Sequence, residues 1–555
     1  MVSFANKSIY QIYPKSFNDS NNDGVGDLLG IVEKLDYLRE LGIDYIWITP
    51  FFVSPQRDNG YDIASYTDID PVFGTMEDFE LLVKEADKRN IGIMLDMVFN
   101  HTSTKHMWFQ KALKGEKKYQ DYYILKEGSK EKAPTNWQSK FGGSAWQYSE
   151  ELGKWYLHLF DVSQADLNWE NKELREELKN IIRFWKAKGV RGFRFDVVNL
   201  ISKPEVFEDD HIGDGRRFYT DGKRVHEYLK ELVKDTGIKD YITVGEMSST
   251  SIEHCIRYSN PKEEELSMCF NFHHLKVDYK DGNKWAVMPA DIKELKNLFK
   301  TWQESMQEGN AWNALFWCNH DQPRIVSRLG DEGRYFRESA KMLAALIHLM
   351  RGTPYIYQGE EIGMSDPHFK NIDMYEDVES LNYYNILKKQ GLSEEEALEI
   401  LDKRSRDNSR TPMQWSDEAY AGFSNAKPWI SLADNYKNIN VKRQENDETS
   451  ILEFYKKLIA LRKESKLISC GNISFIDTAD NIIAYKRKLG DDKLLVICNM
   501  SKKEESLSID CEGFTKALGN YEGLKYDARR LRLAPYEFVA LCNNDLSGSW
   551  QCKQL

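Results

Sequence analysis

Short apolar runs alternate with amphipathic segments along the first hundred residues. Three of the runs are rich in β-branched and aromatic residues, as strands are; they cover residues 8–13, 44–49 and 91–98. Between them, apolar residues three and four positions apart predict helices over residues 33–41 and after Thr75, where Asp78 stands at the reciprocal position of a capping box. Strands alternating with helices indicate right-handed parallel units.

The alternation pauses after the third strand and then continues. Residues 102–170 are rich in Trp, Tyr, Gly and Lys without a clear period, which indicates an insertion. A helix with an apolar face around Leu178 and Trp185 follows, and further strand-like runs come at residues 192–196, 241–246, 269–273, 315–321 and 353–358. Eight strands with helices between them predict an α/β fold, a (β/α)8 TIM barrel.

The pattern changes once more near the end of the chain. Beyond residue 468, short β-type runs at 482–487, 494–499 and 538–541 alternate with turn residues, which predicts a small antiparallel β-sandwich domain. A chain of 555 residues is too long for one compact core. We therefore expect a barrel made of residues 1–101 and 171–467, an insertion domain at 102–170 and a C-terminal domain at 468–555.

Three of the predicted strands end in a carboxylate, namely Asp196, Glu246 and Asp321. The carboxyl ends of barrel strands meet at one rim, where barrel enzymes have their active sites, and a glycosidase needs a pair of carboxyl groups. Burial would raise the pKa of Glu246 and keep it protonated, while Arg194, on the same face of its strand as Asp196, would keep Asp196 ionised. A single such acid is as often a helix cap or an ion-pair partner, but three together favour catalysis.

Net charge and composition argue against several other classes of protein. The formal net charge of −12 disfavours nucleic acid as a partner, and no run approaches the ~18 apolar residues of a membrane span. The first residues lack the apolar region of a secretory signal, and eight scattered cysteines without a Cys-x-x-Cys pair suit reduced thiols. We therefore expect a cytoplasmic protein. We also expect a monomer, although the sequence carries no direct signal of its oligomeric state.

Four short blocks carry a resemblance to a known family. They are Asp96-Met97-Val98-Phe99-Asn100-His101, Gly192-Phe193-Arg194-Phe195-Asp196, Val244-Gly245-Glu246 and Asn319-His320-Asp321. In this order they resemble the conserved regions of the α-amylase superfamily, glycoside hydrolase family 13, and the resemblance extends from about residue 9 to residue 415.

The resemblance implies a retaining mechanism and assigns a role to each residue. Asp196 would be the nucleophile, Glu246 the general acid/base and Asp321 the stabiliser of the transition state. The glucose whose anomeric carbon is attacked occupies subsite −1, and the residues that would hold it there are His101, Arg194 and His320.

Two further stretches, residues 59–62 (Asn-Gly-Tyr-Asp) and 405–410 (Ser-Arg-Asp-Asn-Ser-Arg), are similar to the exo-acting α-glucosidase branch of the superfamily. The resemblance implies that Asp62 and Arg406 pair and grip the non-reducing glucose, with Tyr61 among the substrate-binding residues. Taken alone, Asp62 and Arg406 could equally form an ordinary ion pair. Val197, directly after Asp196, resembles the oligo-1,6-glucosidases of this branch.

Four other stretches, residues 136–143, 213–222, 245–250 and 273–279, resemble the phospho-α-(1,1)-glucosidases of the branch, which hydrolyse trehalose 6-phosphate. The resemblance implies a phosphorylated disaccharide as substrate, with glucose and glucose 6-phosphate as products. A phosphate needs cationic donors beyond the cleaved glucose, and for these we nominate Lys276 and Lys284. Lysines at 276, 280 and 284 in a lysine-rich chain are also typical of a solvated surface.

Three alternatives stay open on the sequence alone. An oligo-1,6-glucosidase or dextran glucosidase would have the same mechanism with a neutral acceptor subsite. A transglycosylase or isomerase would share the covalent intermediate and differ in whether water or a sugar resolves it. A catalytically inactive barrel, serving as a sugar-binding or transporter-accessory module, would have lost carboxylates that this chain retains.

Residues 19–27 (Asp-Ser-Asn-Asn-Asp-Gly-Val-Gly-Asp) place oxygen ligands at alternate positions, like the first part of a calcium-binding loop. Related glucosidases bind one Ca²⁺ at the matching place, which implies a structural ion here, and no catalytic cofactor is expected. The glutamate of a complete EF-hand is missing, and a hydrated Asp/Asn turn is the alternative. The predicted ligands are Asp19, Asn21, Asp23, Val25 and Asp27.

Overall fold

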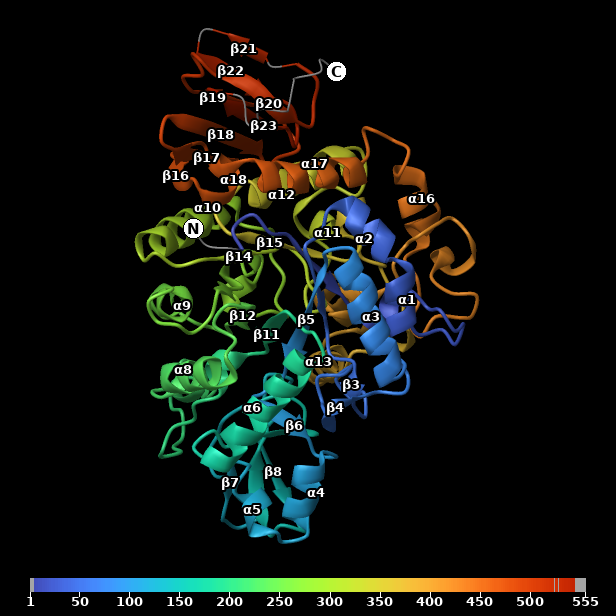
Figure 1. Cartoon of the computed structure of the whole chain (residues 1–555), viewed down its shortest axis with the longest axis vertical. Coiled ribbons are helices and arrows are strands. Elements are labelled where there is room, and N and C mark those ends of the chain that lie inside the picture. Colours follow the sequence, from blue (N-terminus) through green and yellow to red (C-terminus); the bar gives the residue numbers. More distant parts are fainter. Residues whose placement is uncertain (1–3, 524, 528, 545–555) are drawn as a thin grey trace.

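The fold was obtained as a computed structural model, which describes residues 4–523, 525–527 and 529–544. The molecule is elongated, with the barrel in the middle, the insertion at one end and the C-terminal sheets at the other (Figure 1). Cys552 and the last residues of the expected C-terminal domain lie outside the described residues. The residue limits expected for the four segments stay a prediction.

Eight parallel strands form the barrel that the sequence predicts. The sheet order β13-β12-β11-β5-β2-β1-β15-β14 follows the chain around a circle, and a parallel bridge between Cys269 and Asn313 joins its two edges. The strands are β1 (Ile9–Ile12), β2 (Tyr45–Ile48), β5 (Gly92–Met97), β11 (Gly192–Phe195), β12 (Ile242–Glu246), β13 (Met268–Phe270), β14 (Ala314–Leu315) and β15 (Thr353–Tyr357).

Strand β14 is much shorter than the run predicted for it at residues 315–321. Leu315 pairs with Pro354 of β15, and proline has no N–H to donate to a ladder. Residues beyond Leu315 form the loop that carries Asp321, whose backbone N–H donates to the Asn319 side chain at 2.8 Å. Asp321 therefore belongs to a loop at the barrel rim and not to a strand end.

Helices cover the outside of the barrel (Figure 1). The capping box predicted from Thr75 and Asp78 is present at the start of α3 (Met76–Lys88). The helix expected at residues 33–41 is divided at Lys34 into two short helices. The helices around the barrel also include α1 (Leu28–Glu33), α2 (Leu35–Leu41), α6 (Lys172–Ala187), α8 (Val225–Thr236), α9 (Ile252–Ser259), α10 (Ile292–Glu308), α11 (Ile325–Leu329), α12 (Phe336–His348) and α17 (Ile451–Glu464).

Two long excursions leave the barrel. In the insertion after β5, β10 (Gln164–Asp166) pairs antiparallel with β6 (His101–Ser103), so the insertion returns to the strand that it left. Its other elements are α4 (Met107–Leu113), α5 (Lys117–Gln120), β7 (Leu125–Lys126), β8 (Trp146–Ser149) and β9 (Lys154–Leu157). The second excursion follows β15 and was not predicted; it contains α13 (Val378–Lys389), α14 (Glu394–Arg404), α15 (Asp407–Arg410) and α16 (Val441–Gln444).

The C-terminal segment forms two antiparallel sheets, as expected for a small β domain. Their strand orders are β16-β17-β18-β23-β20 and β19-β22-β21. The strands are β16 (Asn472–Ile476), β17 (Ile482–Leu489), β18 (Asp492–Asn499), β19 (Glu505–Ser508), β20 (Thr515–Gly519), β21 (Lys525–Asp527), β22 (Arg530–Leu533) and β23 (Phe538–Cys542).

Helix α17 joins this domain to the barrel. Its Arg462 is fully buried, and the guanidinium donates hydrogen bonds to backbone carbonyls that lie far apart in the chain: those of Ala5, His348, Met350 and Gly352. The four carbonyl oxygens offset much of the cost of burying this charge, and within the described residues only the Nε of Arg462 lacks a hydrogen-bond partner among its nitrogens.

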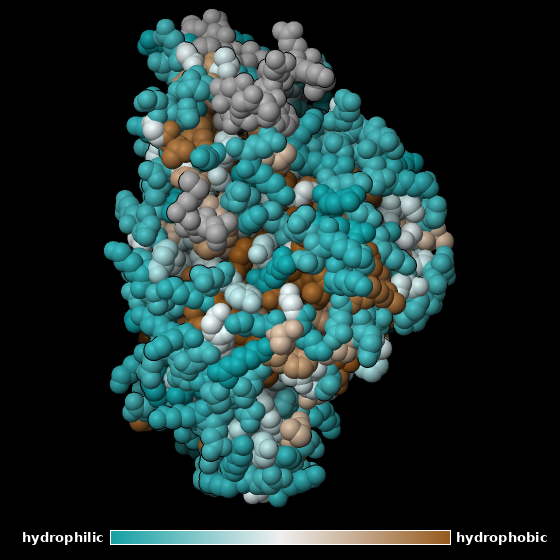
Figure 2. All heavy atoms as spheres, viewed as in Figure 1, coloured by the Kyte–Doolittle hydropathy of each residue, from teal (hydrophilic) through white to brown (hydrophobic). Residues whose placement is uncertain are grey.

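Most buried apolar side chains belong to one core cluster, which extends from the barrel through α17 into the first C-terminal sheet. The face of the molecule in Figure 2 is mainly hydrophilic, and hydrophobic residues show chiefly in the recesses between polar side chains. Within the described residues, no helix combines the length and the apolar character needed to cross a lipid bilayer.

Candidate active site

The three predicted acids line one pocket at the carboxyl end of the barrel strands. Asp196 follows β11, Glu246 is the last residue of β12, and Asp321 lies on the loop after β14. The cavity measures about 230 Å³. Parallel strands thus bring together side chains that are distant in the sequence, as the barrel prediction requires.

Arg194 is the charged centre of this group. Its buried guanidinium lies 2.6 Å from Asp96 Oδ1 and 2.5 Å from Asp196 Oδ1, and it also pairs with Glu246. The contact with Asp196 was predicted from the spacing of the two residues on β11. Burial alone would lower the pKa of Arg194, but the carboxylates of Asp96 and Asp196 outweigh it and hold that pKa above its usual range.

The two predicted histidines lie beside the acids. His101 lines the pocket, and the ring of His320 stacks on Tyr61 with centroids 5.0 Å apart. Burial lowers the pKa of His320 to about 3, so its ring is neutral at neutral pH. The Gln11 amide lies 2.8 Å from Nδ1. With Nδ1 as acceptor, Nε2 carries the proton; it lies 3.4 Å from Asp321 and has no hydrogen-bond partner in the described structure.

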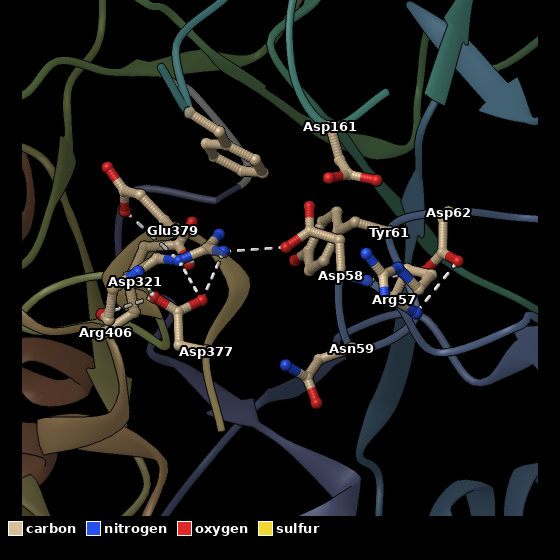
Figure 3. A network of polar contacts seen from close by, with 12 residues as sticks. Arg57, Asp58, Asn59, Tyr61, Asp62, Asp161, Asp321, Asp377, Glu379 and Arg406 are labelled. Atoms are coloured by element: carbon tan, nitrogen blue, oxygen red, sulfur yellow. Dashed lines mark hydrogen bonds and ion pairs between the residues drawn. The ribbon is translucent and has the colours of Figure 1, made fainter. Parts of the chain in front are cut away.

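The ion pair predicted between Asp62 and Arg406 is wrong. Arg406 Nη2 pairs with Asp58 Oδ1 at 2.8 Å and with Asp377 Oδ1 at 2.5 Å. The Asp62 carboxylate instead accepts from Ser54 Oγ at 2.9 Å and from two backbone N–H groups of its own turn. In Figure 3 the Asp58 carboxylate faces Arg406, and Asp62 lies on the far side of Asp58. The carboxylate of Asp62 therefore accepts the backbone N–H groups of its own turn, and the carboxylate of Asp58 pairs with Arg406 in the pocket.

Asp321 is held in its ionised form by its neighbours. Burial alone would raise the pKa of its carboxyl group, but His320 and the guanidinium groups of Arg406 and Arg410 hold that pKa well below its usual range. Arg410 Nη2 lies 2.8 Å and Arg406 Nη1 3.4 Å from Asp321 Oδ1. Both arginines come from the excursion after β15, which therefore completes the site.

The cations nominated for a phosphate also line the pocket. Lys276 is one of the lining residues and has no ion pair within the described part of the chain. Lys284 also lines it, and its Nζ lies 2.6 Å from Glu379. A third lining lysine, Lys140, was not predicted; its Nζ donates to Ser248 Oγ at 3.0 Å.

Sequence reasoning missed several residues of the site: Asp58, Lys140, Asp377, Glu379 and Arg410. The sequence did carry a signal for some of them: Asp58 lies in the same turn as Asp62, and Lys140 lies inside the family-like stretch at residues 136–143. Arg410 was part of the quoted stretch at 405–410. Asp377 and Glu379 lie at the start of α13, in a region for which no element was predicted, and no local signal marked them.

The predicted calcium loop is folded by its own side chains. Asp19 accepts the backbone N–H groups of Asn22 at 2.7 Å and Gly24 at 2.8 Å. Asp27 is the N-cap of α1 and accepts the N–H of Gly30 at 2.6 Å. Across residues 4–523, 525–527 and 529–544, no group of three or more His, Cys, Asp or Glu side chains gathers closely enough to hold a metal ion. The calcium site stays a prediction.

Comparisons with known proteins agree with this geometry. Residues 11–471 match the family model for the catalytic domain of α-amylase, and residues 482–539 match that for the C-terminal domain of the α-amylase SusG. The trehalose-6-phosphate hydrolase of Escherichia coli (strain K12) is 53% identical over 538 residues, covering 96% of this chain and 98% of that protein. The oligo-1,6-glucosidase of Parageobacillus thermoglucosidasius is 45% identical over 544 residues, covering 95% and 97% respectively.

A solved structure gives the same result for the fold. The crystal structure of trehalose-6-phosphate hydrolase from Bacillus licheniformis matches with a TM-score of 0.93 and 52% sequence identity, covering 98% of this chain and 100% of that one. The chain therefore belongs to the α-amylase family and is a glycoside hydrolase.

Proposed function

We propose that this chain hydrolyses the α-glucosidic bond of trehalose 6-phosphate, giving glucose and glucose 6-phosphate with retention at the cleaved carbon. The observation that carries the proposal is one pocket in which Asp196, Glu246 and Asp321 stand together with two lysines, at positions 140 and 276, that have no ion pair within the described part of the chain. Relatives with 52–53% identity over 96% of this chain are trehalose-6-phosphate hydrolases, which supports the same substrate here.

The chemistry follows from the three acids. Asp196 attacks the anomeric carbon while Glu246 gives its proton to the glycosidic oxygen, and glucose 6-phosphate leaves. Glu246 then takes a proton from water, whose oxygen bonds to the same carbon as the bond to Asp196 breaks. Asp321, ionised beside the reacting ring, stabilises positive charge that develops there.

The remaining residues position the unphosphorylated glucose. Arg194 contacts Asp96, Asp196 and Glu246 and fixes the two reacting carboxyl groups relative to each other. The Nε2–H of His320, which has no hydrogen-bond partner among the described residues, is available to a sugar hydroxyl, and His101 lines the pocket.

The Asp58–Arg406 pair also lines the pocket. In this proposal the pair grips the non-reducing glucose, the role that the resemblance implied for Asp62 and Arg406, and so accounts for exo-action.

Product analysis tests the proposal directly. Purified protein is incubated with trehalose 6-phosphate and, in parallel, with isomaltose and trehalose, and the products are separated by anion-exchange chromatography. We expect glucose and glucose 6-phosphate in equal amounts, and much slower turnover of both neutral sugars. A strong preference for isomaltose would overturn the phosphorylated substrate and leave the catalytic assignments standing.

The second candidate is an oligo-1,6-glucosidase, which Val197 directly after Asp196 favours. Relatives with that name are 42–45% identical, and the two substrates share every catalytic step. They differ in the leaving sugar and in the hydroxyl of that sugar that forms the bond, so the isomaltose arm of the product analysis decides between them.

We also propose that residues 19–27 bind one structural Ca²⁺. The donors there are carboxylate, amide and carbonyl oxygens, the ligands that Ca²⁺ prefers. Asp19, Asn21 and Asp23 each already accept a nearby backbone N–H, which curls the loop into a compact turn. The ion would be held by these three side chains, the Val25 carbonyl and Asp27, and it would supply cross-linking of the loop and no chemistry.

We propose a cytoplasmic monomer as the working form. Buried thiols such as those of Cys269, Cys318 and Cys498 suit a reducing compartment, and a phosphorylated sugar is available inside a cell. Light scattering during size-exclusion chromatography measures the mass in solution. A mass near 64.8 kDa is expected for a monomer, and twice that mass would contradict it.

A further inference from the structure

The loop between β7 and β8 brings a lysine of the insertion to the catalytic rim of the barrel. The backbone N–H of Lys140 donates to the Leu159 carbonyl at 2.9 Å, which fixes the loop. Its ammonium group donates to Ser248 Oγ at 3.0 Å. Ser248 is held in turn by Asn199, through two hydrogen bonds of 2.9 Å each. Lys140 is therefore tied at both ends and lines the pocket.

The position of Ser248 shows which side of the pocket Lys140 serves. Ser248 follows Glu246 by two residues on the loop after β12. A general acid lies beside the glycosidic oxygen that it protonates, so the leaving sugar lies on the Glu246 side of the reacting carbon. Lys276 also lines this pocket, and its charge and that of Lys140 repel each other.

The charge balance of the pocket distinguishes its cations. Arg406 pairs with Asp58 and Asp377, and Lys284 pairs with Glu379. Within the described residues, neither Lys140 nor Lys276 has an ion pair, and both are half-buried.

Holding two such cations without an anion is costly. Burial lowers the pKa of Lys140 to about 7, and it lowers the pKa of Lys276 as well. A site that keeps its cations unneutralised is prepared for an anion that arrives with the ligand.

We propose that Lys140, together with Lys276, binds the phosphate of the leaving glucose and so sets the preference for a phosphorylated disaccharide. This inference rests on the proposed function and adds a residue from the insertion to it. A neutral disaccharide would leave both ammonium groups without an anion, whereas a phosphate oxygen gives each a charge-assisted hydrogen bond. Discrimination arises for two reasons: the two cations attract a phosphorylated disaccharide, and a neutral disaccharide pays the cost of covering them without neutralising them.

The test compares two substrates that share the cleaved glucose and differ in the leaving group. Kinetic constants of Lys140→Gln and Lys140→Met are measured on trehalose 6-phosphate and on p-nitrophenyl α-glucoside, which has no phosphate. We expect kcat/KM for trehalose 6-phosphate to fall about 10- to 100-fold more than that for the neutral glucoside, mainly through KM. Lys140→Met keeps the length of the side chain and suits a half-buried position, so it serves if Lys140→Gln is unstable.

The matched control is Lys130→Gln, on the same loop. Lys130 is exposed and pairs loosely with Glu150 at 3.4 Å, so its substitution is expected to change neither constant more than about twofold. A second readout is inhibition of p-nitrophenyl α-glucoside hydrolysis by glucose 6-phosphate. Its inhibition constant should rise about 10-fold or more in Lys140→Met and stay the same in Lys130→Gln.

The outcomes separate this inference from the function on which it rests. An equal loss on both substrates, or a ratio changed less than about threefold, would overturn the role of Lys140. A wild-type protein that cleaves isomaltose and not trehalose 6-phosphate would instead overturn the proposed function. A wild-type protein that cleaves trehalose 6-phosphate alongside an unaffected Lys140→Met variant would remove only the inference.

Discussion

The half of the pocket around Asp196 and the half around Lys276 differ in how their charges are balanced. In the first half, Arg194 contacts three carboxyl groups, including those of Asp96 and Asp196, and Arg406 pairs with two further acids, so that both arginines have anions before substrate arrives. In the second half, Lys140 and Lys276 stand without ion pairs in the described structure. Matched charges fix geometry in advance, whereas unmatched charges leave binding energy to be released by the ligand.

Removing the proposed nucleophile tests the half of the pocket with paired charges and should have the largest effect. Asp196→Asn keeps the shape of the side chain and removes its negative charge, so no covalent intermediate can form. We expect kcat to fall at least about 1,000-fold on trehalose 6-phosphate and on p-nitrophenyl α-glucoside alike, measured by steady-state kinetics. Turnover that survives in Asp196→Asn would show that another residue attacks the sugar.

The corrected ion pair offers a sharper comparison within the same turn. Asp58→Asn removes an anionic partner of Arg406, whereas Asp62→Asn keeps one of the two oxygens that accept backbone N–H groups of its own turn and touches no pocket cation. We expect kcat/KM to fall about 100-fold in Asp58→Asn on both substrates, because a buried arginine loses one anion. Asp62→Asn should change it less than about threefold. An equal fall of kcat/KM in the two variants would show that Asp62 matters as much to catalysis as Asp58 does.

Substrate binding by the half of the pocket around Lys276 should depend on pH above neutrality, whereas binding by the half around Asp196 should not. The pKa of Lys140 is lowered to about 7 by burial, with Arg216, Lys276 and Lys203 adding to the lowering and Asp214 opposing it. Above pH 7 the Lys140 ammonium group of the free enzyme loses its proton. Phosphate binding then requires Lys140 to be protonated again, so KM for trehalose 6-phosphate should rise up to about tenfold per pH unit.

The neutral glucoside provides the control for this titration. The substrate phosphate has a second pKa of about 6 and is already a dianion above pH 7, so it adds no further change. KM for p-nitrophenyl α-glucoside should therefore stay level between pH 7 and 9, while that for trehalose 6-phosphate rises. The same slope for both substrates would assign the titration to a catalytic group and not to Lys140.

Chelation should give the smallest effect, because the predicted calcium loop belongs to neither half of the pocket. If Ca²⁺ binds at residues 19–27, EDTA is expected to lower the melting temperature by about 2–4 °C. Added Ca²⁺ should restore it, and Asp23→Asn should reduce the response. A melting temperature that is unchanged by EDTA and by Ca²⁺ would contradict calcium binding and show that the loop is a turn held by its own hydrogen bonds.

The sequence predicts those parts of the structure that depend on local pattern. Alternating apolar runs were enough for all eight barrel strands, and the spacing of Arg194 and Asp196 was enough for their contact. The end of β14 was missed because its limit depends on pairing with Pro354, which is 39 positions from Leu315 and has no N–H.

The choice between Asp58 and Asp62 failed for a similar reason. Arg406 is 348 residues from Asp58, and only the path of the excursion after β15 decides which carboxylate it meets. Lys140 was overlooked because its significance comes from Ser248 on a different strand loop. Local sequence therefore places the catalytic acids, while long-range packing selects their partners.

The hydrogen bonds of Arg462 have a consequence for the order of folding. Arg462 donates to carbonyl groups near the first strand and at or just after the end of α12, and it lies on a helix that follows every strand of the barrel. A nascent chain that ends before residue 462 contains all eight strands and still lacks the side chain that fastens them at this end. This end of the barrel is thus tied to a residue that is synthesised after all eight strands.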